Sequence, residues 1–204
     1  MTSIAAITID VPDPVAAQRF YDDAFALGDR LGLRVSEAPA SGFRGFTLSL
    51  TVAQPANVHR LADAALGAGA TVLKPVSKSF WGYGGVVQAP DGTIWKIATS
   101  SKKDTAPASR DIDDVVLLLG VEDVAASKRF YTGHGVAVAK SFGRKYVEFA
   151  TPDSPVKFGL YGRRALAKDA GVAPDGSGSH RITINASTGG FTDPDGFVWD
   201  NSMN

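Results

Sequence analysis

The alternation of apolar and polar positions divides the chain into strands and helices. Phe46–Val52 alternates residue by residue, which is typical of a strand with one buried face. The next segment places apolar residues three and four positions apart over residues 58–66, which predicts a helix. Asn57 is its expected cap, and Gly67 or Gly69 its stop. This mixture of strands and helices predicts an α+β fold.

The same patterns extend over the rest of the chain. They predict strands at residues 4–10, 71–76, 84–89, 93–99, 114–120, 137–142, 145–150, 156–161, 180–186, 189–192 and 197–201, and a short helix at 163–171. Residues 100–111 are polar and contain Pro and small residues, so we expect a linker there. Residues 171–179 read as a second flexible loop. The expected halves are therefore residues 1–99 and 112–204.

A helical motif occurs once in each half. Val11–Phe25 and Val121–Gly135 share Val, Asp, Ala, Arg, Phe and Tyr in register, and each follows a predicted strand. Asp13 and Asp123 stand just before the helical spacing begins, where a carboxylate accepts hydrogen bonds from the first backbone N–H groups of a helix. We expect the following phenylalanines to pack their helices on a sheet: Phe20 and Phe130.

A turn motif, Pro-Asp-Gly-x-x-Trp, also occurs twice. Proline fixes φ at the first central position of a turn and glycine accepts positive φ at its end, so each copy is expected to join two antiparallel strands. Trp95 and Trp199 then lie in the strands that follow. The next residue is Lys96 in one copy and Asp200 in the other.

The order of these motifs resembles the glyoxalase/bleomycin-resistance/extradiol-dioxygenase family, the vicinal oxygen chelate superfamily. The resemblance covers nearly the whole chain and implies βαβββ modules whose sheets curl around a ligand cavity. Residues 43–99 and 112–162 resemble complete modules, whereas residues 4–36 and 179–201 resemble shortened ones. How these pieces pair in space does not follow from the sequence.

The resemblance also implies positions for metal ligands, because many members hold a divalent metal with His and Glu. Carried over through strand alternation, these positions fall on Ala6, Thr47, Lys96, Val116, Gly159, Arg181 and Asp200. Only Asp200 is an oxygen ligand of the usual kind, and the charges of Lys96 and Arg181 would repel a cation. No cofactor is therefore favoured. The alternative is a divalent metal at His180 and Asp200, which a one-residue change of register would bring together.

Without a metal, these positions are free for a different ligand. We expect Lys96, Arg181 and Asp200 to form the polar floor of a cavity, in which Asp200 pairs with Arg181 or Lys96 meets an anionic group. The competing interpretation places Lys96 and Asp200 in solvent at strand ends. Aromatic residues expected beside a cavity are Trp81, Tyr83 and Tyr161.

Composition narrows the classes of function. Lys and Arg number 21, as do Asp and Glu, so the net charge of zero favours neither nucleic acid nor a membrane as partner. The chain has no cysteine and no signal-peptide pattern at its start, and we expect a cytoplasmic protein. A small organic ligand is the expected partner. Because members of this family often dimerise to complete a cavity, a homodimer is a further expectation.

Three functions remain open at this point. The first is a metal-independent protein that binds or sequesters a small molecule, as in the drug-binding branch of the family. The second is a metal-dependent lyase, isomerase or dioxygenase of the same superfamily, with catalytic residues that the sequence does not identify. The third is a non-catalytic structural or regulatory module whose cavity is filled by side chains.

Overall fold

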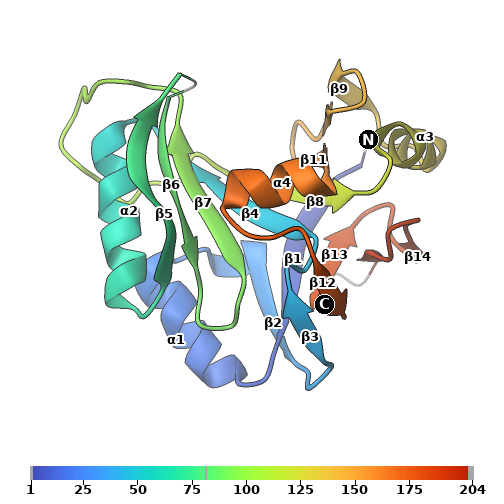
Figure 1. Ribbon diagram of the computed structural model, residues 1–204, viewed down its shortest axis with the longest axis horizontal. Helices are drawn as coiled ribbons and strands as arrows, with labels where there is room; N and C mark the ends of the chain where they lie inside the picture. Colours follow the sequence, from blue (N-terminus) through green and yellow to red (C-terminus); the bar gives the residue numbers. More distant parts are fainter. Residues whose placement is uncertain (1, 81, 202–204) are drawn as a thin grey trace.

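The computed structural model describes residues 2–80 and 82–201, which form two large mixed sheets and four α-helices (Figure 1). Trp81, one of the expected cavity residues, lies outside the described residues. The elements follow the chain as β1 (Ile4–Val11), α1 (Pro14–Ala24), β2 (Leu31–Val35), β3 (Ala40–Gly42), β4 (Phe46–Thr51), α2 (Pro55–Gly67), β5 (Thr71–Ser79), β6 (Gly82–Gln88), β7 (Ile94–Thr99), β8 (Asp114–Val121), α3 (Val124–Gly133), β9 (Val138–Phe142), β10 (Tyr146–Phe149), β11 (Val156–Gly162), α4 (Arg163–Ala170), β12 (Gly176–Gly178), β13 (Ile182–Ala186), β14 (Phe191–Thr192) and β15 (Val198–Asp200).

The eight-stranded sheet is built from the two complete modules. Its strand order is β5-β6-β7-β4-β8-β11-β10-β9. In each module the first strand runs parallel to the last, β4 beside β7 and β8 beside β11. An antiparallel pairing of β4 with β8 joins the two modules into one sheet. These units match the complete modules that the sequence resemblance implied.

The five-stranded sheet answers the question of pairing that the sequence left open. Its order is β14-β15-β13-β1-β2, so the shortened pieces from the two ends of the chain pair with each other. Strand β1 runs antiparallel to β13 and parallel to β2. Each large sheet therefore takes strands from both halves of the chain. A separate two-stranded ribbon joins β3 to β12.

One apolar core lies between helices α1, α2 and α3 and one face of each large sheet. It contains inward-facing residues of the central strands, such as Ile7 of β1, Leu48 of β4 and Leu117 of β8. Helices α2 and α3 contact the strands of the eight-stranded sheet, and α1 contacts α2 and β2. Trp95 and Trp199 of the repeated motif are buried in this core. Among the described residues, no helix is long and apolar enough to cross a membrane.

The helix starts follow the expected capping chemistry with one exception. The Asp13 carboxylate accepts hydrogen bonds from the first backbone N–H groups of α1, and Asp123 does the same for α3. The prediction of Asn57 as the cap of α2 is wrong. That helix begins two residues earlier at Pro55, with Gln54 at the N-cap position, because proline suits the first helical position, where no N–H is needed.

Gln54 and Asn57 instead hold the linker. The Gln54 Oε1 accepts hydrogen bonds from the backbone of Thr105 and Ala106 at 2.7 and 2.9 Å. The Asn57 Oδ1 accepts one from the backbone of Ser109 at 2.9 Å. Residues 101–113 contain no helix or strand, and these contacts fix the segment to the start of α2.

Two buried tyrosines tie the repeated helices to the repeated turns. The Tyr21 hydroxyl of α1 donates a hydrogen bond to Asp91 at 2.6 Å. The Tyr131 hydroxyl of α3 donates one to Asp193 at 2.5 Å and accepts one from the Trp199 indole at 3.1 Å. Both tyrosines are less exposed than the phenylalanines before them. Burial raises the pKa of each tyrosine well above its ordinary value, so both hydroxyls keep their protons as donors.

We expect Tyr131→Phe to lower the free energy of unfolding by about 1.5–3 kcal/mol, the usual contribution of a hydrogen bond to a charged group. For a chain of this length each kcal/mol corresponds to about 2–4 °C in the melting temperature. Tyr161→Phe, at a half-buried tyrosine, is the matched control and should cost less than about 0.5 kcal/mol. Equal losses in urea denaturation would contradict the structural role of Tyr131.

The stability contribution of Asp193 should depend on pH. Burial raises the pKa of this carboxyl above its ordinary value. Its contribution is therefore fully present below the unfolded pKa of about 3.9 and is lost as the pH rises through the folded pKa. The stability of the natural protein relative to Asp193→Asn should be greater at about pH 4 than at about pH 7.

Asp123 provides a control of opposite sign for this experiment. Backbone hydrogen bonds from Ala126 and Ala125 lower the pKa of Asp123. Its contribution is present above the unfolded pKa and is lost as the pH falls through the folded pKa. The stability relative to Asp123→Asn should therefore decrease on acidification. Urea denaturation checks both variants, Asp193→Asn at about pH 4 and pH 7 and Asp123→Asn at about pH 3 and pH 7. Equal trends on acidification would contradict the assignment.

Candidate functional site

Both large sheets have a second face, turned away from the common core, and the expected site residues are distributed over these two faces. On the eight-stranded sheet, Lys96 and Val116 both pair with Ser49 of β4. Leu118 of β8 pairs with Thr47 on one side and Gly159 on the other. The four positions carried over from the resemblance thus lie in two neighbouring rows of one face, as strand alternation predicted.

Helix α4 covers the centre of this face, in front of β4 and β8 (Figure 1). Its apolar residues Leu166, Ala167 and Ala170 are at most 3% exposed. They form a small cluster, separate from the main core, together with side chains from the sheet and the flanking loops: Phe43, Leu73, Val86, Ile94, Leu118, Tyr161 and Val172. The middle of this sheet face is therefore covered by the protein's own helix.

Lys96 is paired with this helix. Its ammonium lies 2.7 Å from the Asp169 carboxylate, and the two side chains are 36% and 46% exposed. Lys74 of β5 donates a second hydrogen bond, to the backbone carbonyl of Lys168 at 2.7 Å. A cleft of about 300 Å³ remains beside α4, and Lys96 and Asp169 lie in its wall. Lys96 is thus only half-exposed, and an acidic group already occupies the position expected for a ligand anion.

The two described aromatic candidates differ in their surroundings. Tyr83 borders the 300 Å³ cleft, and its hydroxyl lies 3.1 Å from Nε2 of His59, on helix α2. Tyr161 packs in the α4 cluster, with its ring centre 5.2 Å from that of Tyr146. The structure does not bring these two tyrosines together around one ligand space.

The outward face of the five-stranded sheet carries a different site. A cleft of about 390 Å³ brings together three of the expected residues, His180, Arg181 and Asp200, with Asp10 and Arg34. The remaining wall consists of backbone and small or apolar residues: Gly178, Ser179, Ile182, Thr183, Gly196 and Val198. We call this space the Arg34 cleft.

The Arg34 guanidinium is oriented by the floor of the cleft. Its Nε and Nη2 atoms donate to the two Asp10 oxygens at 2.7 and 3.1 Å, and Nη2 also donates to the Thr183 hydroxyl at 3.0 Å. The hydrogen bond to Asp10 raises the pKa of Arg34. Within the part of the chain that the structure describes, no hydrogen bond uses its Nη1 group. The side chain is 55% exposed, so this group is accessible to a ligand.

Arg181 precedes the strand on which strand alternation had placed it. Strand β13 begins at Ile182, and Arg181 has a left-handed backbone conformation with φ of 54°. Its Nε and Nη2 atoms both donate to the Ala38 carbonyl, at 3.0 and 2.6 Å. The side chain therefore fastens the loop after β2 to the start of β13, at the margin of the cleft.

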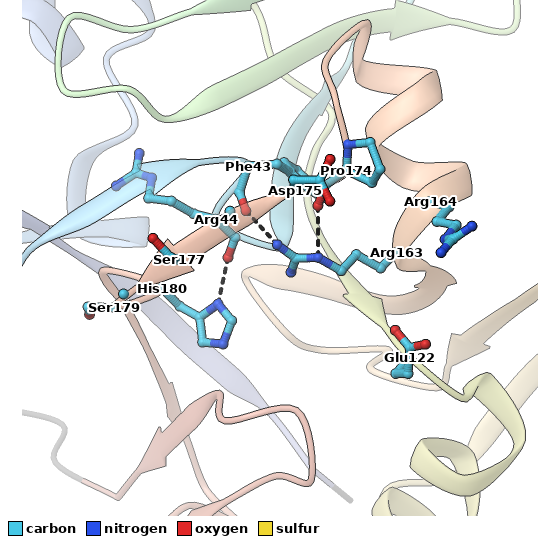
Figure 2. A pocket seen from close by; sticks show the side chains of 12 residues that line it. Phe43, Arg44, Glu122, Arg163, Arg164, Pro174, Asp175, Ser177, Ser179 and His180 are labelled. Carbon is cyan, nitrogen blue, oxygen red and sulfur yellow. Dashed lines mark hydrogen bonds between the residues drawn. The ribbon is translucent and has the colours of Figure 1, made fainter.

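His180 lies between two backbone carbonyls at the boundary with a neighbouring cleft of about 360 Å³ (Figure 2). Its Nδ1 is 2.6 Å from the Arg44 oxygen and its Nε2 is 3.0 Å from the Asp195 oxygen. Its ring stacks on Phe197 with centres 4.0 Å apart. Arg163 on the far side donates to the carbonyls of Phe43 and Pro174, so this neighbouring cleft is held together by side chains that bind backbone.

These residues do not fit a divalent cation. A histidine ligand needs a free nitrogen lone pair, and both ring nitrogens of His180 are directed at carbonyl oxygens, which can only accept hydrogen bonds. Among residues 2–80 and 82–201, no group of three or more His, Cys, Asp or Glu side chains could hold a metal. The pair His180 and Asp200 therefore has no third ligand of these types within the described chain.

Asp10 and Arg34 were not among the expected site residues. Asp10 alternates with Ala6 along β1 and so lies on the same outward face, but no strand was predicted at Arg34. The signal was present in Leu31–Val35, where Leu31, Leu33 and Val35 alternate with Gly32 and Arg34. The register that pairs Asp10 with Arg34 across β1 and β2 is a long-range feature, visible only in the structure.

Solved structures with the same architecture support the fold assignment. A V278E mutant of glyoxalase I from Zea mays aligns with 98% of this chain and 91% of its own, with a TM-score of 0.62 and 14% identity. Another structure of Zea mays glyoxalase I covers 92% of this chain and 75% of its own, with a TM-score of 0.59 and 15% identity. The chain has the vicinal oxygen chelate fold.

A protein from Bacillus subtilis strain 168, named for a proposed dioxygenase activity, has the same fold. It aligns with 95% of this chain and 71% of its own, with a TM-score of 0.56 and 12% identity. No protein-family sequence model and no curated protein sequence matches the chain. At these identities the similarity is one of fold, and the chemistry must be argued from the residues of the vicinal oxygen chelate fold as they stand here.

The packing of α4 predicts which of its contacts stabilise it. Leu166→Ala should lower the free energy of unfolding by about 2–4 kcal/mol because it removes a buried side chain. Lys96→Met should cost less than about 1 kcal/mol because the ion pair with Asp169 is half-exposed. Chemical denaturation checks both, with Val15→Ala, an exposed apolar position, as control. A larger loss for Lys96→Met would show that the ion pair is the main anchor.

Proposed function

We propose that this protein is a metal-independent binding protein for a small zwitterion, which it holds in the Arg34 cleft. The observation that carries the proposal is the oriented, half-exposed Arg34 guanidinium, whose Nη1 group has no hydrogen-bond partner in the described chain. A guanidinium held in this way is suited to bind a carboxylate through parallel hydrogen bonds.

The charges of the Arg34 cleft support a ligand with both signs. The cleft contains two arginines, Arg34 and Arg181, and two aspartates, Asp10 and Asp200. Asp10 is paired with Arg34, and Asp200, on strand β15, also interacts electrostatically with the Arg34 guanidinium. A ligand carboxylate at Arg34 and a ligand ammonium directed toward Asp200 leave the site electrically balanced. A purely anionic or purely cationic ligand meets repulsion from one member of the set.

The same residues support metal independence. His180 directs both ring nitrogens at backbone carbonyls, and Arg181 places a permanent positive charge at the edge of the cleft. We therefore assign no metal-dependent step to this site. Ligand recognition is carried by charge-assisted hydrogen bonds from arginine and aspartate.

A second candidate function is a non-catalytic structural or regulatory module. Helix α4 covers the outward face of the eight-stranded sheet with Leu166, Ala167 and Ala170. This favours the second candidate, because a covered face leaves little space for a substrate. This candidate predicts no ligand at either large sheet, so the titration below separates the two.

Three probes that share a skeleton test the binding proposal: L-phenylalanine, phenethylamine and 3-phenylpropanoate. We expect NMR titration to move the amide signals of Arg34, Thr183 and Asp200 with the zwitterion and more weakly with the two singly charged probes. Arg34→Met should lower the affinity for L-phenylalanine by about tenfold, since hydrogen bonds to charged groups contribute about 1.5–3 kcal/mol. Asp200→Asn should reduce the preference for L-phenylalanine over 3-phenylpropanoate, because the ligand ammonium loses its carboxylate partner.

Arg164→Met is the matched control, because this exposed arginine lies on α4, outside the cleft. Chelator treatment, with metal content measured by mass spectrometry, should leave the titration unchanged. If none of the three probes moves these amides, the binding proposal fails and the structural module is favoured. Binding that disappears with the chelator would contradict metal independence.

A further inference from the structure

The two Pro-Asp-Gly turns use their carboxylates differently. Aligned residue by residue, Asp91 of the first turn corresponds to Asp195 of the second, and Ala89 corresponds to Asp193. The second half therefore has two carboxylates at this turn, where the first half has one. These carboxylates contact helix α1 in the first half and helix α3 in the second.

In the second half, the two carboxylates bind different groups. Asp193 accepts hydrogen bonds from the Tyr131 hydroxyl and from the backbone N–H of Phe197. Asp195 accepts the backbone N–H of Glu122 at 2.8 Å and the Ser127 hydroxyl at 3.0 Å. Asp195 thereby ties the turn to the start of helix α3.

In the first half, Asp91 alone makes the bonds that Asp193 makes in the second half. Asp91 accepts the Tyr21 hydroxyl at 2.6 Å and the backbone N–H of Thr93 at 2.7 Å, as Asp193 does in the second half. The residues that correspond to Glu122 and Ser127 are Pro12 and Ala17. Proline has no backbone N–H and alanine has no hydroxyl, so neither can bind the turn as its counterpart does.

A cleft of about 370 Å³ opens where these two bonds are missing. Its apolar wall is formed by Pro12, Ala17 and Phe20 on the side of α1 and by Pro90 on the side of the turn. The charged residues around it comprise three carboxylates and one guanidinium: Asp13, Asp23, Asp91 and Arg19. We call this space the Pro12 cleft.

We propose that the Pro12 cleft is a second ligand site, independent of the Arg34 cleft, for a small organic cation with an apolar body. Pro12, Phe20 and Pro90 provide flat apolar surface for the body. Asp13 and Asp23, both exposed residues, provide the charge complementary to an ammonium group. The Asp91 carboxylate is already paired with the buried Arg44 guanidinium, 3.7 Å away. Asp91 closes the inner end while bound to Tyr21.

Benzylamine is the probe, with benzyl alcohol and benzoate as neutral and anionic controls of the same size. We expect millimolar benzylamine to shift the NMR amide signals of Ala16, Ala17 and Asp91, with weaker effects from benzyl alcohol and still weaker effects from benzoate. Asp23→Asn should lower the affinity for benzylamine by about threefold, because an ion pair with an exposed carboxylate contributes little. Asp22→Asn, on the same helix but outside the cleft, should leave the affinity unchanged.

Two variants close the cleft by different means. The triple change Pro12→Glu, Ala17→Ser and Ala89→Asp transfers the second-half arrangement to the first half and should abolish the shifts. Ala16→Met, at an exposed helix position, fills the opening with little risk to folding and should weaken binding at least severalfold. Shifts that survive in a folded Ala16→Met protein, equal shifts with benzoate, or no shifts with benzylamine would each overturn the proposal.

Discussion

The architecture depends on buried hydrogen bonds between a helix tyrosine and a turn carboxylate, formed once in each half. A carboxylate inside a protein is stabilised only when donors surround it, and each turn supplies backbone N–H groups while the helix supplies a hydroxyl. The bond positions the Phe-Tyr helix against the strand that carries the buried tryptophan. It thereby holds the helix and the strand together in the common core.

The outward faces of the two large sheets differ in what covers them. In the eight-stranded sheet the central groove holds α4, whose apolar side chains leave Lys96 paired with Asp169. In the five-stranded sheet the outward face is polar and open, and Asp10 orients Arg34 along it. One outward face can thus be covered by a helix while the other stays open, since the core on the opposite side of each sheet is unaffected.

Local patterns predicted much of this arrangement. The caps at Asp13 and Asp123 and the alternation around Lys96 followed from chemistry within a few residues. The pairing of β1 with β13 did not, because it joins segments at opposite ends of the chain. Arg181 is instructive: alternation placed it on a strand face, whereas its positive φ takes it out of the strand and commits its side chain to Ala38. The Asp10–Arg34 pair required the unpredicted strand β2, and whether Lys96, Arg181 and Asp200 meet a ligand stays a prediction.

The pairing of the two chain ends also has a consequence for synthesis on the ribosome. Thr8 bonds Asn185, 177 residues later, so at about 5–20 residues per second strand β1 waits roughly 10–35 s for its partner. During that interval β2 can cover one edge of β1, while the other edge presents unpaired backbone groups, a known starting point for aggregation. Nascent chains of this protein should therefore depend on chaperones longest in the segment that is made first.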